Sequence, residues 1–202
     1  MLFHMLAEEP IQFFRIVAIV IISITLHELG HGLAALSQGD NTPRKTGHLT
    51  LNPLVHMGWE SIVFLCVAGI AWGQMPVNPS KFRSAKFSNI LVSAAGPMVN
   101  LALGILCIAL MKLLVVSDAT EIFSINFLHL AAQINLMLFL FNLLPIPPLD
   151  GFHVFSELFP FLKPLDDGRC GLFGLMILLL IPDFNAGLAA IADLIIKALS
   201  GM

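Results

Sequence analysis

Long apolar runs, each interrupted by only a few polar residues, organise the sequence. They cover Ile11 to about Leu36, residues 88–116, and Ile122 to about Leu144. A helix rises about 1.5 Å per residue, so each run is long enough to cross the roughly 30 Å hydrocarbon core of a bilayer. Other apolar segments cover 58–74, 170–182 and 184–199, and an amphipathic one covers 152–162. The pattern predicts an all-α polytopic membrane protein with roughly six hydrophobic segments.

The polar link after the first run changes character along its length. Residues 37–46 are rich in turn formers, and residues 47–53 then alternate apolar and polar side chains up to Pro53. Such alternation is typical of a short strand. Residues 58–74 are apolar but short and interrupted by glycine. We therefore expect a short re-entrant or β-hairpin-like element around 47–74, inside a single domain that covers residues 1–202.

Basic residues decide between a re-entrant element and a full crossing. They flank residues 58–74 on both sides, as Arg44, Lys45, Lys81, Arg83 and Lys86. Cytoplasmic loops collect Lys and Arg, so a re-entrant element keeps all of them on one side, whereas a crossing divides them. The acidic turn with Asp118 and Glu121 is then external. The first and third long helices then end toward the same, cytoplasmic face.

Composition supports a membrane protein and removes other classes. Of the 202 residues, 57% are hydrophobic and 11% are charged, whereas soluble domains carry about a quarter charged residues. The net charge of −3 provides no basic field for nucleic acid. The cysteines Cys66, Cys107 and Cys170 are dispersed in apolar stretches. Their spacing matches neither a zinc site nor a disulfide framework.

The second half of the first apolar run contains the motif His27-Glu28-Leu29-Gly30-His31. Residues four apart share a helix face, so both imidazoles can point at one metal ion. Two imidazoles at this spacing supply half of a tetrahedral zinc site. Glu28 lies where it can take a proton from a metal-bound water. Ionisable side chains are costly at this depth in a membrane, and a bound cation offsets that cost.

A catalytic zinc needs a third protein ligand and an open position. The candidates are His4, His48, His56, His129, His153, Asp150 and Glu157. Asp150 stands out because it follows the break Pro145–Pro148 and precedes Gly151, which together fix and then turn the backbone. The alternative role of Asp150 is to cap the next half-helix. His153 and Glu157, four residues apart on that half-helix, are expected to form a surface pair.

Several motifs together resemble the site-2 protease family of intramembrane zinc metalloproteases, in its compact prokaryotic form without a PDZ or CBS domain. The main ones are HELGH at 27–31, AGPMVN at 95–100 and NLLPIPPLDG at 142–151. Shorter ones are GDNTPR at 39–44, GHLTLNP at 47–53 and PVNP at 76–79. The likeness covers about residues 15–160. Two departures are a missing acidic residue after His56 and Gln74 in place of a lysine.

The resemblance implies a role for each matching residue. His27, His31 and Asp150 would bind one Zn²⁺ per chain, and Glu28 would be the general base and later the proton donor. Asn142 would hydrogen-bond the scissile carbonyl or its oxyanion. Asn100 would brace the site between helices. The supporting and substrate-contacting positions would be Asn100, Gly96, Pro97, Gly47, Leu49, Leu51 and Asn52.

The expected function is hydrolysis of peptide bonds in or near transmembrane segments of membrane-anchored proteins. Because such substrates are helical, a segment must unwind, and an exposed strand edge over Gly47–Asn52 is the expected holder, with a plain interfacial loop as the alternative. The expected location is the cell (inner or plasma) membrane, multi-pass, with the active site open to the cytoplasmic side. Expected partners are a single-pass protein substrate, the lipid bilayer and a regulatory membrane protein, but no nucleic acid.

The catalytic core is expected at about 11–160, followed by C-terminal helices at about 164–200. The alternative function is a membrane metal transporter or a non-catalytic metal-binding membrane scaffold. A transporter predicts further His, Asp or Glu side chains along a continuous path. The sequence shows one compact group instead.

Overall fold

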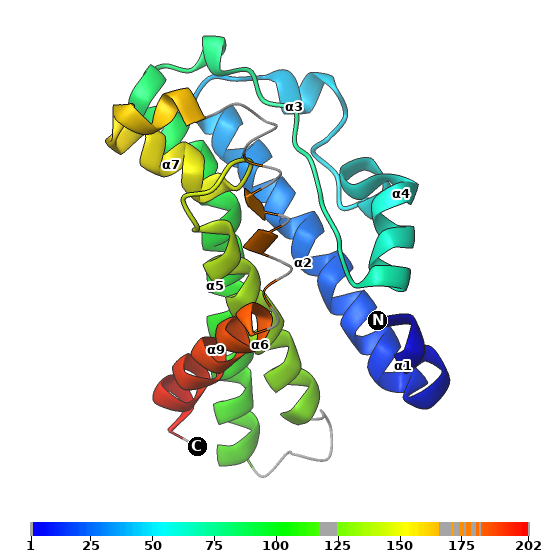
Figure 1. Cartoon of the computed structure of the whole chain (residues 1–202). Helices are drawn as coiled ribbons and strands as arrows, with labels where there is room; N and C mark the ends of the chain where they lie inside the picture. Colours follow the sequence, from blue (N-terminus) through cyan, green and yellow to red (C-terminus); the bar gives the residue numbers. More distant parts are fainter. Residues whose placement is uncertain are drawn as a thin grey trace.

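The structure is a computed structural model (Figure 1) that describes residues 2–117, 125–165, 171, 174–175, 177–178, 181 and 183–201. Among these residues, three helices are long and apolar enough to cross a membrane, namely α2 (Pro10–Ser37), α5 (Ala85–Val116) and α6 (Ile125–Asn142). The described residues contain no strand. The predicted all-α membrane fold is therefore confirmed. The expected acidic turn at Asp118 and Glu121, Cys170 and much of the 170–182 segment lie outside the described residues.

Shorter elements connect and cover these three helices. They are α1 (Leu2–Glu8), α3 (Thr42–Lys45), α4 (Pro53–Ala68), the 3₁₀ turns η1 (Pro79–Lys81) and η2 (Pro160–Leu165), α7 (Asp150–Leu158) and α9 (Phe184–Ser200). Proline at the first helical turn starts α2 and α4, because its missing N–H has no partner there anyway. Gly69, in the left-handed conformation, ends α4.

Helix α5 forms the centre of the bundle, since α2, α6, α7 and α9 all pack against it (Figure 1). Small residues allow these close approaches. A Cβ on Gly30 would lie 2.8 Å from Val99 Cγ2, and a Cβ on Gly104 would lie 3.0 Å from Leu136 Cγ. A buried cluster joins α5, α6 and α9 through Ile108, Ala132, Leu136, Ala192 and Ile196. Helix α2, which carries the HELGH motif, and helix α7, which begins with Asp150, therefore both pack on α5.

The chain between α2 and α5 forms a re-entrant element. Helix α4 runs beside α2, turns at Gly69, and an extended segment over residues 70–78 then returns along α2 (Figure 1). The main-chain N–H of Gln74 donates to the carbonyl of His56, 2.9 Å away, and the N–H of Asn78 donates to Asp40, 2.7 Å away. The element thus leaves from and returns to the C-terminal end of α2.

The strand expected over Gly47–Asn52 does not form, so that prediction is wrong. Gly47 has a φ of +74°, and the residues after it are bends. Asn52 is the N-cap of α4, with its side chain accepting from the N–H of Leu54 at 3.1 Å. The alternation of side chains belongs to a loop that leads into a helix cap. The extended segment of this element lies later, at residues 70–78.

Candidate metal centre and active site

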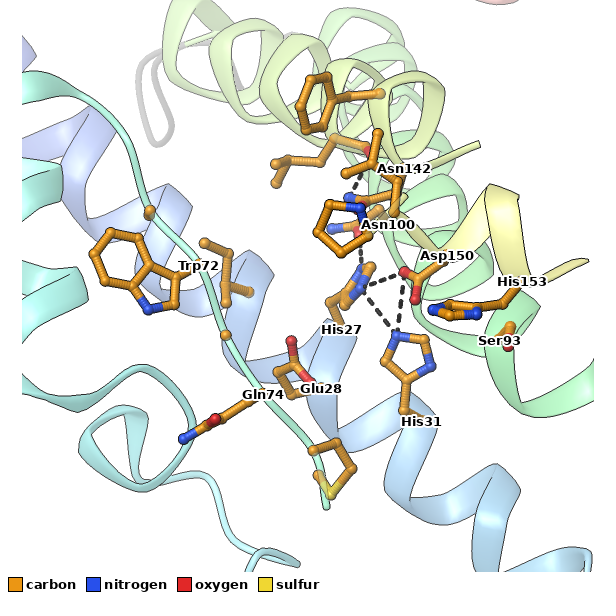
Figure 2. A pocket seen from close by; sticks show the side chains of 18 of the residues that line it. His27, Glu28, His31, Trp72, Gln74, Ser93, Asn100, Asn142, Asp150 and His153 are labelled. Carbon is orange, nitrogen blue, oxygen red and sulfur yellow. Dashed lines mark hydrogen bonds and ion pairs between the residues drawn. The ribbon is translucent and has the colours of Figure 1, made fainter. Parts of the chain in front are cut away.

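The predicted metal ligands meet at one point. His27 and His31 project from α2, and Asp150 projects from the first turn of α7 (Figure 2). The two Nε2 atoms are 3.1 Å apart, and Asp150 Oδ2 lies 3.1 Å from His27 Nε2 and 3.3 Å from His31 Nε2. Asp150 makes no capping bond to α7. The arrangement supports Asp150 as the third ligand rather than as a helix cap.

Hydrogen bonds fix the tautomer of both imidazoles. His27 Nδ1 donates to Asn100 Oδ1 at 2.5 Å, and His31 Nδ1 donates to the carbonyl of Val92 at 2.7 Å. Both Nε2 atoms are then unprotonated acceptors, as metal-ligating histidines require. Two such acceptors and a carboxylate oxygen cannot hydrogen-bond one another. A cation bound between these three acceptor atoms would give each of them a partner.

The orientation of Asn100 is fixed in turn by a chain of buried amides. Asn100 Nδ2 donates to Asn135 Oδ1 at 3.2 Å, and Asn135 Nδ2 donates to the carbonyl of Ala131 at 2.9 Å. The two amide side chains are 0% and 3% exposed, so each amide has only one satisfactory orientation. This relay crosses from α2 through α5 to α6. It places the predicted brace, Asn100, directly behind His27, one of the predicted metal ligands.

Glycine residues let the backbone come close to the ligands. A Cβ on Gly96 would collide with His31 Nε2 and lie 2.5 Å from His27 Nε2. A Cβ on Gly151 would lie 2.7 Å from the carbonyl oxygen of Leu144. Pro97 follows Gly96 inside α5 and has no N–H to donate to the carbonyl of Ser93. The small-residue break in α5 therefore makes room for the two imidazoles.

The donor set fits zinc. Ligands about 2.0–2.1 Å from a tetrahedral zinc lie roughly 3.3–3.4 Å apart, and the three donor pairs here are 3.1–3.3 Å apart. Two imidazoles and one carboxylate leave a fourth position open, as in catalytic zinc sites. His27, His31 and Asp150 are the one group of His, Cys, Asp or Glu side chains among the described residues whose ligand atoms lie close enough together to hold a metal ion.

A cavity of about 760 Å³ opens beside the ligands and contains the predicted catalytic residues. The carboxylate of Glu28, a buried residue, lines it next to the histidines (Figure 2). Asn142, in the last turn of α6, also lines it. One amide hydrogen of Asn142 is donated to the carbonyl of Leu138 at 2.9 Å, and the second makes no hydrogen bond to any residue that the structure describes. Glu28 and Asn142 thus face the cavity that the metal ligands share.

The extended segment forms the opposite wall of this cavity, through residues 70–75 and Val77 (Figure 2). A Cβ on Gly73 would lie 2.5 Å from Glu28 Oε1, so the backbone passes directly over the carboxylate of Glu28. Ser61 of α4 accepts from the N–H of Trp72 at 2.8 Å and donates to its carbonyl at 2.6 Å. The hydroxyl of Ser61 thereby makes the two main-chain hydrogen bonds that a neighbouring strand would make to Trp72.

Asp40 anchors the far end of the segment. Its side chain is 0% exposed and accepts from the hydroxyl of Thr42 and from the N–H groups of Thr42 and Asn78, the last two at 2.9 and 2.7 Å. Burial raises the pKa of Asp40, but these hydrogen bonds and the nearby Lys81 outweigh burial and hold the pKa below its ordinary value. Asp40 therefore remains a carboxylate that ties the segment to the end of α2.

The remaining predicted site residues lie elsewhere. Gly47, Leu49, Leu51 and Asn52 do not line the cavity. Leu49 packs near Gly32 of α2, and Leu51 is 67% exposed. Their assignment as substrate-contacting positions depended on the strand that does not form.

Several residues near the site were not assigned to it from sequence. They are Asn135, Asp40, Ser61, Trp72, Gly73, Met75, Ser93 and His153. Polar residues inside apolar runs are the available signal for Asn135, Ser61 and Ser93. The surface pair expected between His153 and Glu157 is wrong, because His153 lines the cavity while Glu157 bonds Asn89 and Lys163.

Known proteins place the chain in a family. The family model described as Peptidase family M50 matches residues 15–121 and 108–181. A Bacillus subtilis protein with the printed name "Putative zinc metalloprotease YwhC" is 40% identical over 151 residues, which cover 72% of this chain and 69% of that protein. Rip2 of Mycobacterium tuberculosis, named in the same way, is 33% identical over 173 residues, which cover 79% of this chain and 64% of that protein.

A more distant relative, the zinc metalloprotease MJ0392 of Methanocaldococcus jannaschii, is 29% identical over 136 residues, which cover 66% of this chain and 31% of that protein. No solved structure matches the chain. The family matches and the geometry of the three ligands agree on Zn²⁺ as the metal. The chain belongs to peptidase family M50, the site-2 protease family of intramembrane zinc metalloproteases.

Proposed function

We propose that this chain is an endopeptidase of the site-2 type, which cleaves membrane-anchored proteins in or near their transmembrane segments. One observation carries the proposal: His27, His31 and Asp150 converge beside the buried Glu28 in a cavity walled by helices α2, α5 and α6, all long enough to span a bilayer. A peptidase site enclosed by such helices has access to substrates that are themselves within the membrane.

Zinc held by His27, His31 and Asp150 would supply Lewis-acid activation of water and of the substrate carbonyl. Glu28 accepts the proton of the attacking water and passes it to the leaving amine. Its carboxylate has no hydrogen-bond partner among the described residues, so it is available for both transfers. The covering Gly73 backbone limits the directions from which water reaches the carboxylate.

Asn142 stabilises the negative charge that develops on the carbonyl oxygen. Its amide has one hydrogen left over from the bond to Leu138 and lies in the cavity wall. A neutral donor placed at such an oxyanion typically lowers the activation free energy by about 3–4 kcal/mol. Asn142 therefore acts at a different atom of the substrate from Glu28.

The extended segment offers an edge for an unwound substrate. In extended chain, N–H and C=O groups of alternate residues point to opposite edges. The groups of Trp72 and Gln74 point to α4, where Ser61 and His56 bind them. The groups of Gly73 and Met75 then face the cavity, and they make no hydrogen bond to the described residues. A substrate strand paired with this free edge lies across the metal ligands.

The orientation follows from charge. The basic residues of the two loops next to α4 and the extended segment, Arg44, Lys45, Lys81, Arg83 and Lys86, all lie where α2 ends and α5 begins. Cytoplasmic ends of membrane helices collect such residues. We infer a cell-membrane protein whose cavity opens to the cytoplasmic side. Selection of a single-pass substrate then depends on the cavity and on regulatory membrane partners.

A metal transporter is not favoured by the cavity. Its titratable lining consists of the three ligands with Glu28 and His153, among the residues that the structure describes. Such a compact set does not make a path across the membrane.

Cleavage assays in detergent test the proposed function. The substrate is a synthetic single-span peptide of leucine and alanine with a glycine-containing break near one end, labelled for fluorescence. We expect the wild-type chain to cleave it and Glu28→Gln to lose at least about 1,000-fold in rate while keeping its zinc, since the general base is lost but the ligands remain. The matched control is Glu8→Gln, on the exposed surface of α1. Unchanged cleavage by Glu28→Gln contradicts the assignment.

A further inference from the structure

The cavity wall made by α5 and α7 carries two polar side chains that no step above uses. His153 lies one turn after Asp150 on α7, and Ser93 lies one turn before Pro97 on α5. Both line the cavity, and Figure 2 shows them on the side of Asp150 that is remote from Gln74 and the extended segment. Neither side chain hydrogen-bonds any described residue. Both are therefore free to bind a ligand in the cavity.

Neither residue is needed to hold the two helices together. Glu157, one turn further along α7, accepts from Asn89 of α5 at 3.0 Å and from Lys163 at 2.9 Å. Phe152 is buried in the same helix, and the hydroxyl of Ser156 donates to the carbonyl of His153 within α7, 3.1 Å away. Helix α7 is thus fixed to α5 through Glu157 and Asn89, and the imidazole of His153, which contacts the ring of Phe152 edge-on, makes no hydrogen bond to the residues that the structure describes.

A strand bound along Gly73 and Met75 has a second edge, which faces α5 and α7. Its N–H and C=O groups need partners, because an unpaired main-chain group in a water-poor cavity costs about 1–3 kcal/mol. An imidazole has one donor and one acceptor, and a hydroxyl serves as both. The chain already uses this solution once, where the hydroxyl of Ser61 satisfies both main-chain groups of Trp72.

We propose that His153, assisted by Ser93, is a substrate-binding residue that hydrogen-bonds the main chain of the unwound substrate on the edge away from the extended segment. The inference rests on the proposed function and adds the second wall of the substrate site. The substrate strand then lies between two polar edges, Gly73 and Met75 on one side and His153 and Ser93 on the other. The metal ligands lie between the two edges.

Steady-state kinetics with the same single-span peptide test this role. Loss of one hydrogen bond in His153→Ala raises KM about tenfold, changes kcat by less than about threefold, and leaves one zinc per chain. His153→Gln, which keeps a donor and an acceptor, returns KM to within about threefold of wild type. Ser93→Ala gives a smaller rise in KM. The matched control is His4→Ala, on the exposed surface of α1.

Three results overturn the role of His153: a wild-type KM in His153→Ala, a loss of zinc, which shows that it acts through Asp150, or a fall in kcat alone. The proposed function fails separately, if the wild-type chain does not cleave the peptide or if Glu28→Gln cleaves it normally. If Glu28→Gln is inactive but His153→Ala has the KM of the wild type, the proposed function stands. Only the role of His153 in binding the second edge of the substrate is then contradicted.

Discussion

The two walls of the cavity are built in different ways. The wall that carries His27, His31 and Asp150 belongs to helices packed around α5. The groups that support its two histidines are paired through Asn100, Asn135 and the carbonyl of Val92. The opposite wall is an extended segment held by separate hydrogen bonds from Ser61, the carbonyl of His56 and Asp40. Its side chains include partly exposed apolar ones, with Ile70 49% and Trp72 46% exposed.

The difference separates two tasks. Ligands of a catalytic metal must be held within fractions of an ångström, which requires buried, fully paired supporting groups. A wall that receives an unwound peptide needs free main-chain groups and some freedom to adjust. The comparison therefore predicts that changes behind the ligands alter zinc binding, whereas changes behind the extended segment alter substrate binding and leave zinc in place.

The largest effect is expected from Gly96→Ala. The added methyl group would overlap both Nε2 atoms, and the hydrogen bonds to Asn100 and Val92 prevent the rings from moving aside. We expect the zinc affinity to fall at least about 100-fold, and cleavage with it. Metal analysis after gel filtration measures the loss. Gly187→Ala, in α9 with open space around the position, is the matched control. Full zinc content in Gly96→Ala would show that the ligands are not held as described.

Asn100→Ala gives a graded version of the same test. It leaves His27 Nδ1 without its acceptor, so that the ring is no longer held in one tautomer and orientation. The zinc affinity is expected to fall about 10–100-fold, measured by competition with a chromophoric chelator. Asn135→Ala, one hydrogen bond further from the metal, should cost several-fold less. Equal losses from both variants would contradict a relay that weakens with distance.

Ser61→Ala is expected to have the smallest effect and to act on the other wall. It removes both hydrogen bonds to Trp72 and loosens the start of the free edge. KM for the single-span peptide should rise about five- to tenfold while the zinc affinity stays unchanged. Ser37→Ala, at the exposed end of α2, serves as the control. A drop in zinc affinity here would mean that the two walls are not independent.

The ligands could be predicted from sequence because local rules place them. Spacing on a helix brings His27 and His31 together, and the proline run before Asp150 with the glycine after it marks a fixed turn. The error over Gly47–Asn52 has a local cause as well. Alternating side chains that end in Asn-Pro describe a loop leading into a helix cap as readily as a strand.

The opposite wall could not be predicted, because distant residues create it. The extended conformation of residues 70–78 depends on Ser61 and His56 in α4 and on Asp40, which is 38 positions before Asn78. The position of His153 depends on how α7 docks on α5. The spacing in the sequence pairs His153 with Glu157. In the structure, α7 packs on α5 so that His153 lines the cavity, while Glu157 accepts hydrogen bonds from Asn89 and Lys163.

X-ray absorption at the zinc edge, combined with metal analysis of the purified chain, tests the central claim most directly. We expect one zinc per chain with two imidazole nitrogens and a carboxylate oxygen, all about 2.0–2.1 Å from the metal. Asp150→Ala should lose the oxygen ligand and most of the metal, because the third donor beside His27 and His31 is removed. A chain without zinc, or a zinc whose ligands are the same in Asp150→Ala as in the wild type, would contradict the site.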